Sequence, residues 1–399
     1  MSTNLNSLAV PSEVQPFPPL SEASRGLKIR WYRCPIAHER LRELSRRTDR
    51  QGWIQAGGHF LLYLIVAAIT WACWSMQQWW AMVVALWFLG VVASYFKGTA
   101  THELGHGTVF RTRSLNRFFL YTFSMISWWD PFDYATSHTY HHRYTTHPNA
   151  DRENLLPLEP SLRPWMLVQL LTFNLFTRPG RNFSKGGFIW TVYLTGRSAL
   201  ALPPGHHHIP SQEWRKTLHE DQPQAFKQSM QWSRLLLVFH ASVLLIAIVS
   251  GFWILPLILT LPSYIANLLS YLTGTTQHCG LQQNVTDFRK NTRSIRLNPM
   301  LAFLYWHMNW HTEHHMYAGV PCYNLKALAQ ELKTDMPEPK SLLGAWIEMR
   351  QIWKRQQSDP DYCHEVAVPK PSENSEPDDV DGQLVNSIGE LAPTGLRQL

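Results

Sequence analysis

The sequence predicts an all-α integral membrane protein with four transmembrane helices, arranged as two hairpins beneath a cytosolic helical cap. Three observations predict this fold class. Long apolar runs alternate with polar stretches along the 399 residues. The chain contains 18 tryptophans, whose indole rings favour the interface between water and bilayer. Histidines cluster directly after the apolar runs, which indicates a site beside the membrane.

The first predicted hairpin consists of the runs "HFLLYLIVAAITWACWSM" and "WWAMVVALWFLGVVASYF", at about residues 58–76 and 79–97. Each run is near the lower limit of about 17 residues for a membrane helix. Only Gln77 and Gln78 separate the two runs. We therefore expect two spans joined by a tight turn.

The second predicted hairpin lies between Leu235 and Leu272, an apolar run too long for one span. It divides near Ser250 and Gly251, which predicts spans at about residues 234–250 and 252–272. Two hairpins return the chain to its starting side. Residues 98–233 and everything after 273 are then expected in one compartment, which the excess of Arg and Lys makes the cytosol.

Two shorter apolar pieces, "WMLVQLLTFNLF" and "FIWTVYLTGRSALAL", are bounded or interrupted by Arg178, Arg181, Lys185 and Arg197. Such pieces are typical of amphipathic helices that lie on the membrane surface. We expect interfacial helices here rather than further spans.

The two ends of the chain differ in composition from its centre. Residues 1–25 are rich in Ser and Pro, and residues 365–399 form an acidic tail, so both are predicted to be disordered. Residues 26–345 are predicted to form the membrane domain. The N-terminus has no basic segment followed by an apolar core, so a cleaved signal peptide is not expected.

Charge and cysteine usage exclude some classes of function. The net charge of +7 comes without a basic stripe interleaved with aromatics, so nucleic-acid binding is not expected. The 5 cysteines are scattered and show no CxxC pair. A disulfide framework and a structural zinc site are therefore not indicated.

Histidine clusters follow the first predicted hairpin. "THELGH" places His102 and His106 four residues apart, on one face of a helix. "SHTYHHRYTTH" places His138, His141 and His142 at spacings that we also expect to share one face.

A second set of histidines follows the other hairpin. "TTQHCG" contains His278, and "WHMNWHTEHHMYAGVP" contains His307, His311, His314 and His315. If the last stretch is one helix, its four imidazoles fall within an arc of about 100°, where a helix normally carries its apolar stripe. The clusters are distant in sequence but are predicted to meet on one side of the bilayer.

Convergent imidazoles predict a metal site. Neutral imidazole is a common ligand of iron, zinc, copper and nickel, and a single zinc needs at most four ligands. Nine or ten rings are enough for two metals. The absence of clustered carboxylates disfavours the carboxylate-bridged di-iron bundle, so an all-histidine di-iron site is the favoured interpretation.

Two other classes of protein remain as less favoured alternatives. "HELGH" matches the HExxH pattern of zinc proteases, with Glu103 as the general base. That reading leaves the other clusters unexplained. A histidine-rich metal transporter would place its ligands within the spans near mid-membrane, whereas these clusters flank the spans.

The three clusters "HELGH", "HTYHH" and "HTEHH" resemble the histidine boxes of the membrane fatty acid desaturase and hydroxylase superfamily, over roughly residues 55–345. The resemblance implies that the iron ligands are His102, His106, His138, His141, His142, His278, His311, His314 and His315. The third box begins with His311, where front-end desaturases carry Gln. That departure argues against the front-end subgroup.

Other residues are candidates for the edge of the site. His307 is a possible additional ligand or a partner of a ligand, and Asn309 is the alternative if the backbone there is not helical. Asp151 is one of the carboxylates that could bind a metal or accept the second N–H of a ligand ring. Gly274 stands where the acyl-CoA desaturase subgroup carries an Asn that holds a water near one iron.

The resemblance also implies an activity. It predicts two irons, O₂ as co-substrate, and desaturation of an alkyl chain in an acyl-type lipid or related lipophilic metabolite, with alkyl hydroxylation as the alternative. The chain lacks the HPGG haem motif, so electrons are expected from a separate cytochrome b5 or ferredoxin. The expected location is the endoplasmic reticulum membrane or a bacterial inner membrane, with the site facing the cytosol.

Overall fold

The computed structural model describes residues 22, 25–151, 153, 157–178, 186–202, 218–359 and 362–370. This part of the chain is mostly helical, with almost no strand. Its strands are two residues each, β1 (Ile295–Arg296) and β2 (Lys340–Ser341), which pair in parallel. The predicted all-α class is confirmed for these residues. Most of the two predicted disordered ends lies outside them.

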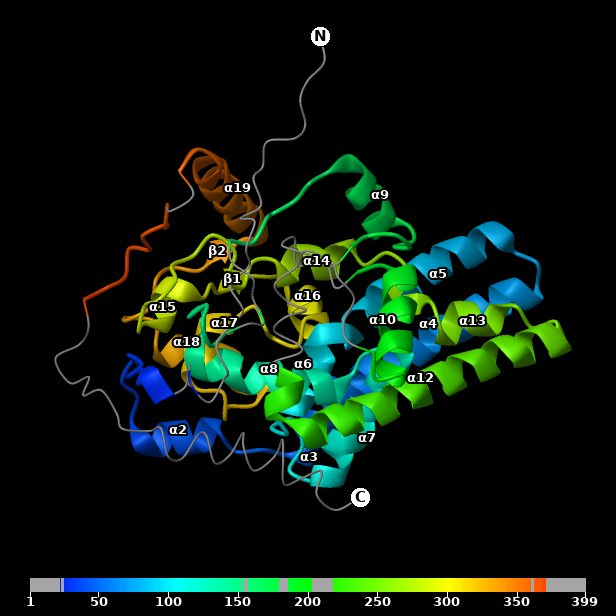
Figure 1. Cartoon of the computed structure of the whole chain (residues 1–399), viewed down its shortest axis with the longest axis horizontal. Helices are drawn as coiled ribbons and strands as arrows, with labels where there is room; N and C mark the ends of the chain where they lie inside the picture. The colour runs from blue at the N-terminus through cyan, green and yellow to red at the C-terminus, as the bar shows by residue number, and fades with distance from the viewer. Residues whose placement is uncertain are drawn as a thin grey trace, which may run out of the picture.

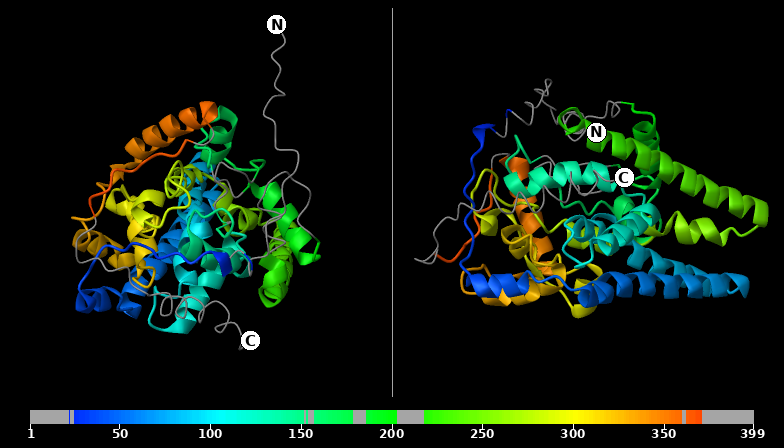
Figure 2. Two further views of the ribbon diagram at one scale, coloured as in Figure 1. Left: turned by 60° about the vertical axis from the view of Figure 1, so that its left-hand side comes forward. Right: turned by 90° about the horizontal axis from the view of Figure 1, so that it is seen from below.

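Three helical segments of the described chain are long and apolar enough to cross a membrane, namely Asp49–Ser75, Trp79–Gly105 and Pro223–Ser250. They contain α4 (Gly58–Ser75), α5 (Trp79–Ser94) and α12 (Pro223–Ser250). In Figures 1 and 2 these helices project together from one side of a helical cap. Many of their large apolar side chains are exposed, as lipid-facing positions require.

The first predicted hairpin agrees with the structure. α4 and α5 pack against each other, and the turn between them places Gln77 in the left-handed region at φ 56°. Before α4 the chain forms α2 (His38–Leu44), α3 (Asp49–Gly52) and the π-helix η1 (Trp53–Gly57).

The predicted fourth span, residues 252–272, is not one helix, and four spans are not confirmed. After Gly251, at φ 77°, the chain forms only α13 (Ile254–Leu259), the short 3-10 helix η3 (Pro262–Tyr264) and α14 (Leu268–Gly274). Figure 1 shows α13 returning beside α12. The second hairpin therefore has a broken returning arm.

Proline and partner contacts explain this break. Pro262 has no N–H for a helical hydrogen bond, and its ring disfavours a continuous helix. Beyond it the backbone pairs with another segment, because Ala266 N donates to Thr172 O at 2.9 Å and Asn174 N donates to Tyr264 O at 2.7 Å. The apolar run predicted a span, but these tertiary hydrogen bonds hold non-helical backbone in its place.

A kink at the end of α5 aims the first histidine box. Lys97 has an extended ψ of 117° and Gly98 has a φ of 72°, inside the segment η2 (Phe96–Ala100). A positive φ is easily adopted only by glycine. The chain then starts α6 (Thr101–Gly105) in a new direction, and this helix carries the first box.

The remaining helices form the cap. α9 (Pro164–Leu171) and α10 (Phe188–Ala199) correspond to the predicted interfacial helices, and at 8 and 12 residues they are too short to span a bilayer. The other elements of the cap are α7 (Arg113–Ile126), α8 (Pro131–Tyr144), α15 (Phe288–Asn291), α16 (Pro299–Leu304), α17 (His311–Met316), η4 (Cys322–Asn324), α18 (Leu325–Glu331) and α19 (Leu342–Ser358).

A buried turn between α16 and α17 orients the third histidine box. Trp306, fully buried in this turn, donates its indole N–H to His59 Nδ1 of α4 at 2.9 Å. The other ring nitrogen of His59 lies 3.0 Å from Val92 O of α5. This chain of contacts ties the box to both helices of the first hairpin.

Candidate metal centre

The nine histidines of the three boxes and the post-span segment lie in two buried groups. The first group is His102, His106, His138, His142 and His314, and the second is His141, His278, His311 and His315. Within each group the ligand nitrogens all lie within 4.8 Å of one another. The predicted convergence of clusters that are distant in sequence is confirmed.

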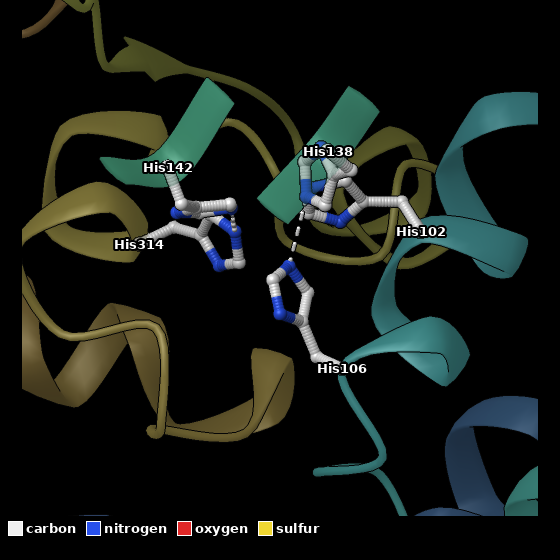
Figure 3. A group of neighbouring side chains, drawn as sticks. All are labelled: His102, His106, His138, His142 and His314. Carbon is white, nitrogen blue, oxygen red and sulfur yellow. Dashed lines mark hydrogen bonds between the residues drawn. The ribbon is translucent and has the colours of Figure 1, made fainter. Parts of the chain in front are cut away.

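The first group joins three segments of the chain. His102 lies on α6 and His106 at its end, His138 and His142 lie on α8, and His314 lies on α17. Figure 3 shows the five rings pointing toward one another. The Nε2 atoms of His138 and His106 are 3.1 Å apart, and those of His314 and His142 are 3.3 Å apart.

The second group joins α8 and α17 to the segment after α14. His311 Nε2 lies 2.9 Å from His278 Nε2 and 3.1 Å from His315 Nε2. The ring of His141 lies edge-on to His278 and His315, with centroids 4.8 Å away from each. No histidine of the first box belongs to the second group, so the two groups are built from different sets of segments.

Helical periodicity divides the second and third boxes between the two groups. His138 and His142 of α8 are four residues apart and face the first group, whereas His141 faces the second. Neighbouring residues on a helix are turned by about 100°. The second box therefore presents one face of α8 to the site, and that face is divided between the two groups. α17 repeats the division, because His314 faces the first group and His311 the second.

Carboxylates bind the outward ring nitrogens of three histidines. The Nδ1 atoms of His102 and His138 lie 2.9 Å from Glu103 Oε1 and Glu153 Oε2, respectively. The Glu153 carboxylate accepts, so His138 Nδ1 carries the hydrogen and His138 Nε2 presents a bare lone pair to the first group. Glu103 is fully buried, and burial favours the protonated form of a carboxyl group, so its contact orients the His102 ring without fixing the tautomer of that ring.

Asp151 does the same for the second group. Its Oδ2 lies 2.9 Å from His141 Nδ1 and accepts the backbone N–H of Thr146 at 2.7 Å. Burial would raise the pKa of Asp151, but the contacts with His141 and Thr146 hold it below its usual value. The structure thus places Asp151 as a partner of a ring rather than among the converging nitrogens.

A backbone carbonyl and a hydroxyl orient two further rings of the second group. His278 Nδ1 donates to Asn291 O at 2.9 Å. Thr145 Oγ1 gives its own hydrogen to His141 O at 2.6 Å, so it accepts from His315 Nδ1 at 3.1 Å. Both rings therefore also turn a bare Nε2 inward.

These donor sets fit metal cations. In the second group, the Nε2 atoms of His141, His278 and His315 are lone-pair acceptors, and His311 can donate at most one hydrogen to them. In the first group, His102 Nε2 is buried with no hydrogen-bond partner in the described chain. Lone pairs brought together in a buried site repel unless a cation lies between them.

Burial keeps these rings neutral. Desolvation, with neighbouring imidazoles, holds the pKa values of His138, His311 and His315 well below the usual range. Burial likewise lowers the pKa of His278 to about 3. A neutral imidazole keeps the lone pair that a metal needs, so the site is ready to bind a cation at neutral pH.

His307 and Asn309 lie outside both groups. The stretch from His307 to His315 is not one helix, because α16 ends at Leu304 and α17 begins at His311, so the condition that places His307 on the face of the box is not met. Trp306 and His307 between them have left-handed φ values of 51° and 56°. This turn removes His307 from the face of the box. Asn309 Nδ2 donates to Ile295 O at 2.9 Å, and its Oδ1 is buried with no hydrogen-bond partner in the described chain.

The geometry disfavours the zinc-protease alternative. Glu103 is fully buried and contacts His102 Nδ1, while a second ring, His314, has its Nδ1 at 3.6 Å from the same oxygen. A general base must reach a metal-bound water. Glu103 instead lies behind the rings, on the side away from their converging nitrogens.

A sequence model of the fatty acid desaturase family matches residues 77–344. The match covers well over half of the chain. The chain belongs to the fatty acid desaturase family. No curated protein matches it. Membership of this family implies an oxidoreductase, and its members are iron-dependent. In this desaturase-family chain, the matched region contains all nine converging histidines.

The carbonyl of Asn291 and the hydroxyl of Thr145 were not predicted from the sequence. Both orient ligand rings of this desaturase-family site, yet a backbone carbonyl carries no residue-type signal. Thr145 lies three residues after His142 of the second box, and this proximity is the sequence signal that could have indicated its role. Such partners become visible only when distant segments are placed side by side.

Proposed function

We propose that this protein is an O₂-dependent di-iron membrane oxidase that desaturates an alkyl chain of a fatty acyl lipid or related lipophilic metabolite. One observation carries the proposal: two adjacent, buried, all-histidine groups turn bare Nε2 lone pairs inward. Each group has enough ligands for one iron. Family membership supports iron as the metal.

The overall reaction balances with an external source of electrons. The alkyl chain loses two hydrogen atoms and gains a carbon–carbon double bond. O₂ takes up those hydrogens together with two electrons and two protons, and forms two waters. Bound iron would supply the O₂ chemistry. Because neutral imidazoles would not compensate the positive charge of the iron, the metal would be strongly electrophilic.

The residues of the chain would bind the irons and orient the ligand rings. The nine rings would hold the irons, with the first group on α6, α8 and α17 and the second on α8, α17 and the segment after α14. Glu153 and Asp151 would fix the tautomer and direction of the rings they contact, and Glu103 would fix the direction of the His102 ring. The burial of both groups excludes bulk water from the reacting carbon.

We also propose that electrons come from a separate cytochrome b5 or ferredoxin, and that the site faces the cytosol. Members of the family typically use lipid substrates and electron donors. The arrangement of the apolar helices supports this orientation, because α4, α5 and α12 project from one side of the cap that holds the histidines.

Cells that express the wild type, His314→Ala or His38→Ala would test the function. His38 is exposed on α2 and serves as the control. We expect lipids lacking two hydrogens in cells with the wild type and the control but not with His314→Ala, and about two irons per purified wild-type chain. Products that gain an oxygen instead would indicate hydroxylation. One zinc per chain, with lipids unchanged by any variant, would contradict the proposal.

A further inference from the structure

A cavity of about 90 Å³ touches both histidine groups. His102 and His138 of the first group line it, and so do His141 and His311 of the second. A molecule in this cavity therefore contacts both groups at once. If the proposed oxidase function holds, on which this inference rests, the cavity holds the part of the substrate that surrounds the reacting carbon.

Polar and apolar atoms contribute about equally to the wall of this cavity, although few of its residues are apolar. Among its described lining residues, Leu170 is the only one with a purely aliphatic side chain. The non-histidine polar residues of the wall are Ser94, Lys97, Thr99, Tyr134, Glu153, Asn174, Ser263, Asn267, Ser270, Tyr271, Gln277 and Tyr305. A plain methylene chain would give no hydrogen bond to those of these groups that lack a protein partner, which is unfavourable.

Several hydroxyls of the wall can only accept further hydrogen bonds. Ser94 Oγ donates to Val91 O at 2.8 Å, and Ser263 Oγ donates to Ala93 O at 3.1 Å. Ser270 Oγ donates to the backbone carbonyl of Ser94 at 3.3 Å. Each hydroxyl hydrogen is thus already used. The oxygens that remain can accept hydrogen bonds from a bound molecule or from water.

Asn267 adds a buried acceptor without a partner. Its Oδ1 atom is buried and has no hydrogen bond within the described chain. A buried polar atom left unpaired is costly, and such atoms in a native site call for a ligand or an ordered water. Lys97, whose ammonium lies 5.0 Å from the centre of the Tyr264 ring, brings positive charge to the same wall.

We propose that the substrate carries hydroxyl or amide N–H donors within a few bonds of the carbon that is oxidised. A long-chain lipid with a hydroxylated or amide-bearing head meets this requirement, since the head supplies donors for Asn267 and the serines and acceptors for Lys97. The methylene middle of an ordinary acyl chain does not. Specificity of this kind is strong because an analogue without the donors leaves buried acceptors unpaired.

Two matched probes test the proposal on the full-length protein in lipid nanodiscs. One is the vicinal diol of hexadecane, and the other is its dimethyl ether, which keeps the oxygens and loses both donors. We expect the diol to bind about tenfold more tightly than the ether, as the loss of a buried hydrogen bond implies, and to raise the unfolding temperature more. Equal affinity, or no binding of either probe, overturns the proposal.

Variants at Asn267 assign the effect to the cavity. Asn267→Leu keeps the size of the side chain and removes the acceptor, so the preference for the diol should fall several-fold while ether binding is retained. Asn267→Asp keeps an acceptor and should keep the preference. Unfolding temperatures without probe report whether each variant folds. An undiminished preference in folded Asn267→Leu contradicts the assignment.

Failure of this inference is distinguishable from failure of the oxidase function. One outcome is that plain acyl chains are oxidised at mid-chain, that this activity is lost in His314→Ala, and that the diol and the ether bind equally. This outcome would contradict the inference about the substrate and support the oxidase function. Absence of iron together with unchanged lipids removes the function, on which the inference rests. Oxidation next to a hydroxyl or amide head supports both.

Discussion

At the scale of single residues, the site depends on the direction of each imidazole. Rings whose outward nitrogen has an acceptor keep their hydrogen there, as His138 does with Glu153 and His141 with Asp151. The inward nitrogen is then free to bind a cation. Each carboxylate contacts a ring of one group only, and Asp151 also accepts the backbone N–H of Glu153 at 3.1 Å, so we expect each substitution to act mainly on one group.

We expect Asp151→Asn to weaken metal binding in the second group and Glu153→Gln to weaken it in the first. Loss of such a partner typically costs 10- to 100-fold in metal affinity or activity. Metal analysis of purified protein over a range of free iron concentrations measures the effect. Glu159→Gln is the control, because Glu159 pairs with the exposed Arg163 on the surface. Iron binding by all three variants at wild-type affinity would contradict this role.

A second residue-scale prediction concerns His307, which lies outside both groups. We expect His307→Asn to retain its iron, since asparagine tolerates the left-handed conformation of this turn. His311→Ala should lose iron from the second group. The iron content of the two purified variants tests this prediction. If His307→Asn lost as much iron as His311→Ala, His307 would be a ligand.

At the scale of elements, the close contact of α5 with the broken second hairpin positions the segment that carries His278. A Cβ atom added at Gly90 of α5 would lie 2.3 Å from the backbone oxygen of Ile265, too close to be accommodated without movement. Ile265 belongs to the non-helical stretch between η3 and α14. Glycine at position 90 is what lets these backbones meet.

We expect Gly90→Ala to destabilise the protein by about 1–3 kcal/mol, as overpacking does, and to lower iron binding in the second group. Gly196→Ala is the matched control, because Gly196 lies within α10 with nothing near a new Cβ. The control should be neutral or stabilising by about 0.5–1 kcal/mol. Thermal unfolding and iron content measure both. Equal stability of the two variants would show that the second hairpin moves to accommodate the new Cβ atom, and would contradict the prediction.

At the scale of the whole molecule, the proposed topology places the turns of both hairpins on the opposite side of the membrane from the histidines. Met76 lies at the turn after α4 and is exposed, and Cys363 is exposed beyond α19. The two positions should therefore be reached from opposite sides.

Labelling with a membrane-impermeant thiol reagent tests this topology in sealed vesicles of known orientation. Met76→Cys, in a chain with Cys73→Ala and Cys363→Ala, should react from the side away from the cytosol. Cys363, in a chain with Cys73→Ala, should react from the cytosolic side. Cys34, Cys279 and Cys322 are buried and should stay unreactive in both. Labelling of both positions from one side would contradict the two-hairpin arrangement.

The sequence by itself determined the all-α class, the first hairpin and the nine histidines of the candidate site. Apolar runs and imidazole spacing are local properties, and local properties are what a single sequence displays. Which histidine belongs to which group was not predictable in this way. His141 and His142 belong to different groups because α17 and the segment after α14 bring their own histidines to different sides of α8.

Only the tertiary structure decided that the fourth apolar run is broken, that His307 turns away, and that acceptors line the cavity. The run near Pro262 is apolar enough for a span, but backbone hydrogen bonds to Thr172 and Asn174 hold it in another conformation. The cavity wall combines Ser94 with Ser263 and Asn267, which come from a distant part of the chain. Contacts between distant segments set all three outcomes, and the energy of such contacts overrides local propensity.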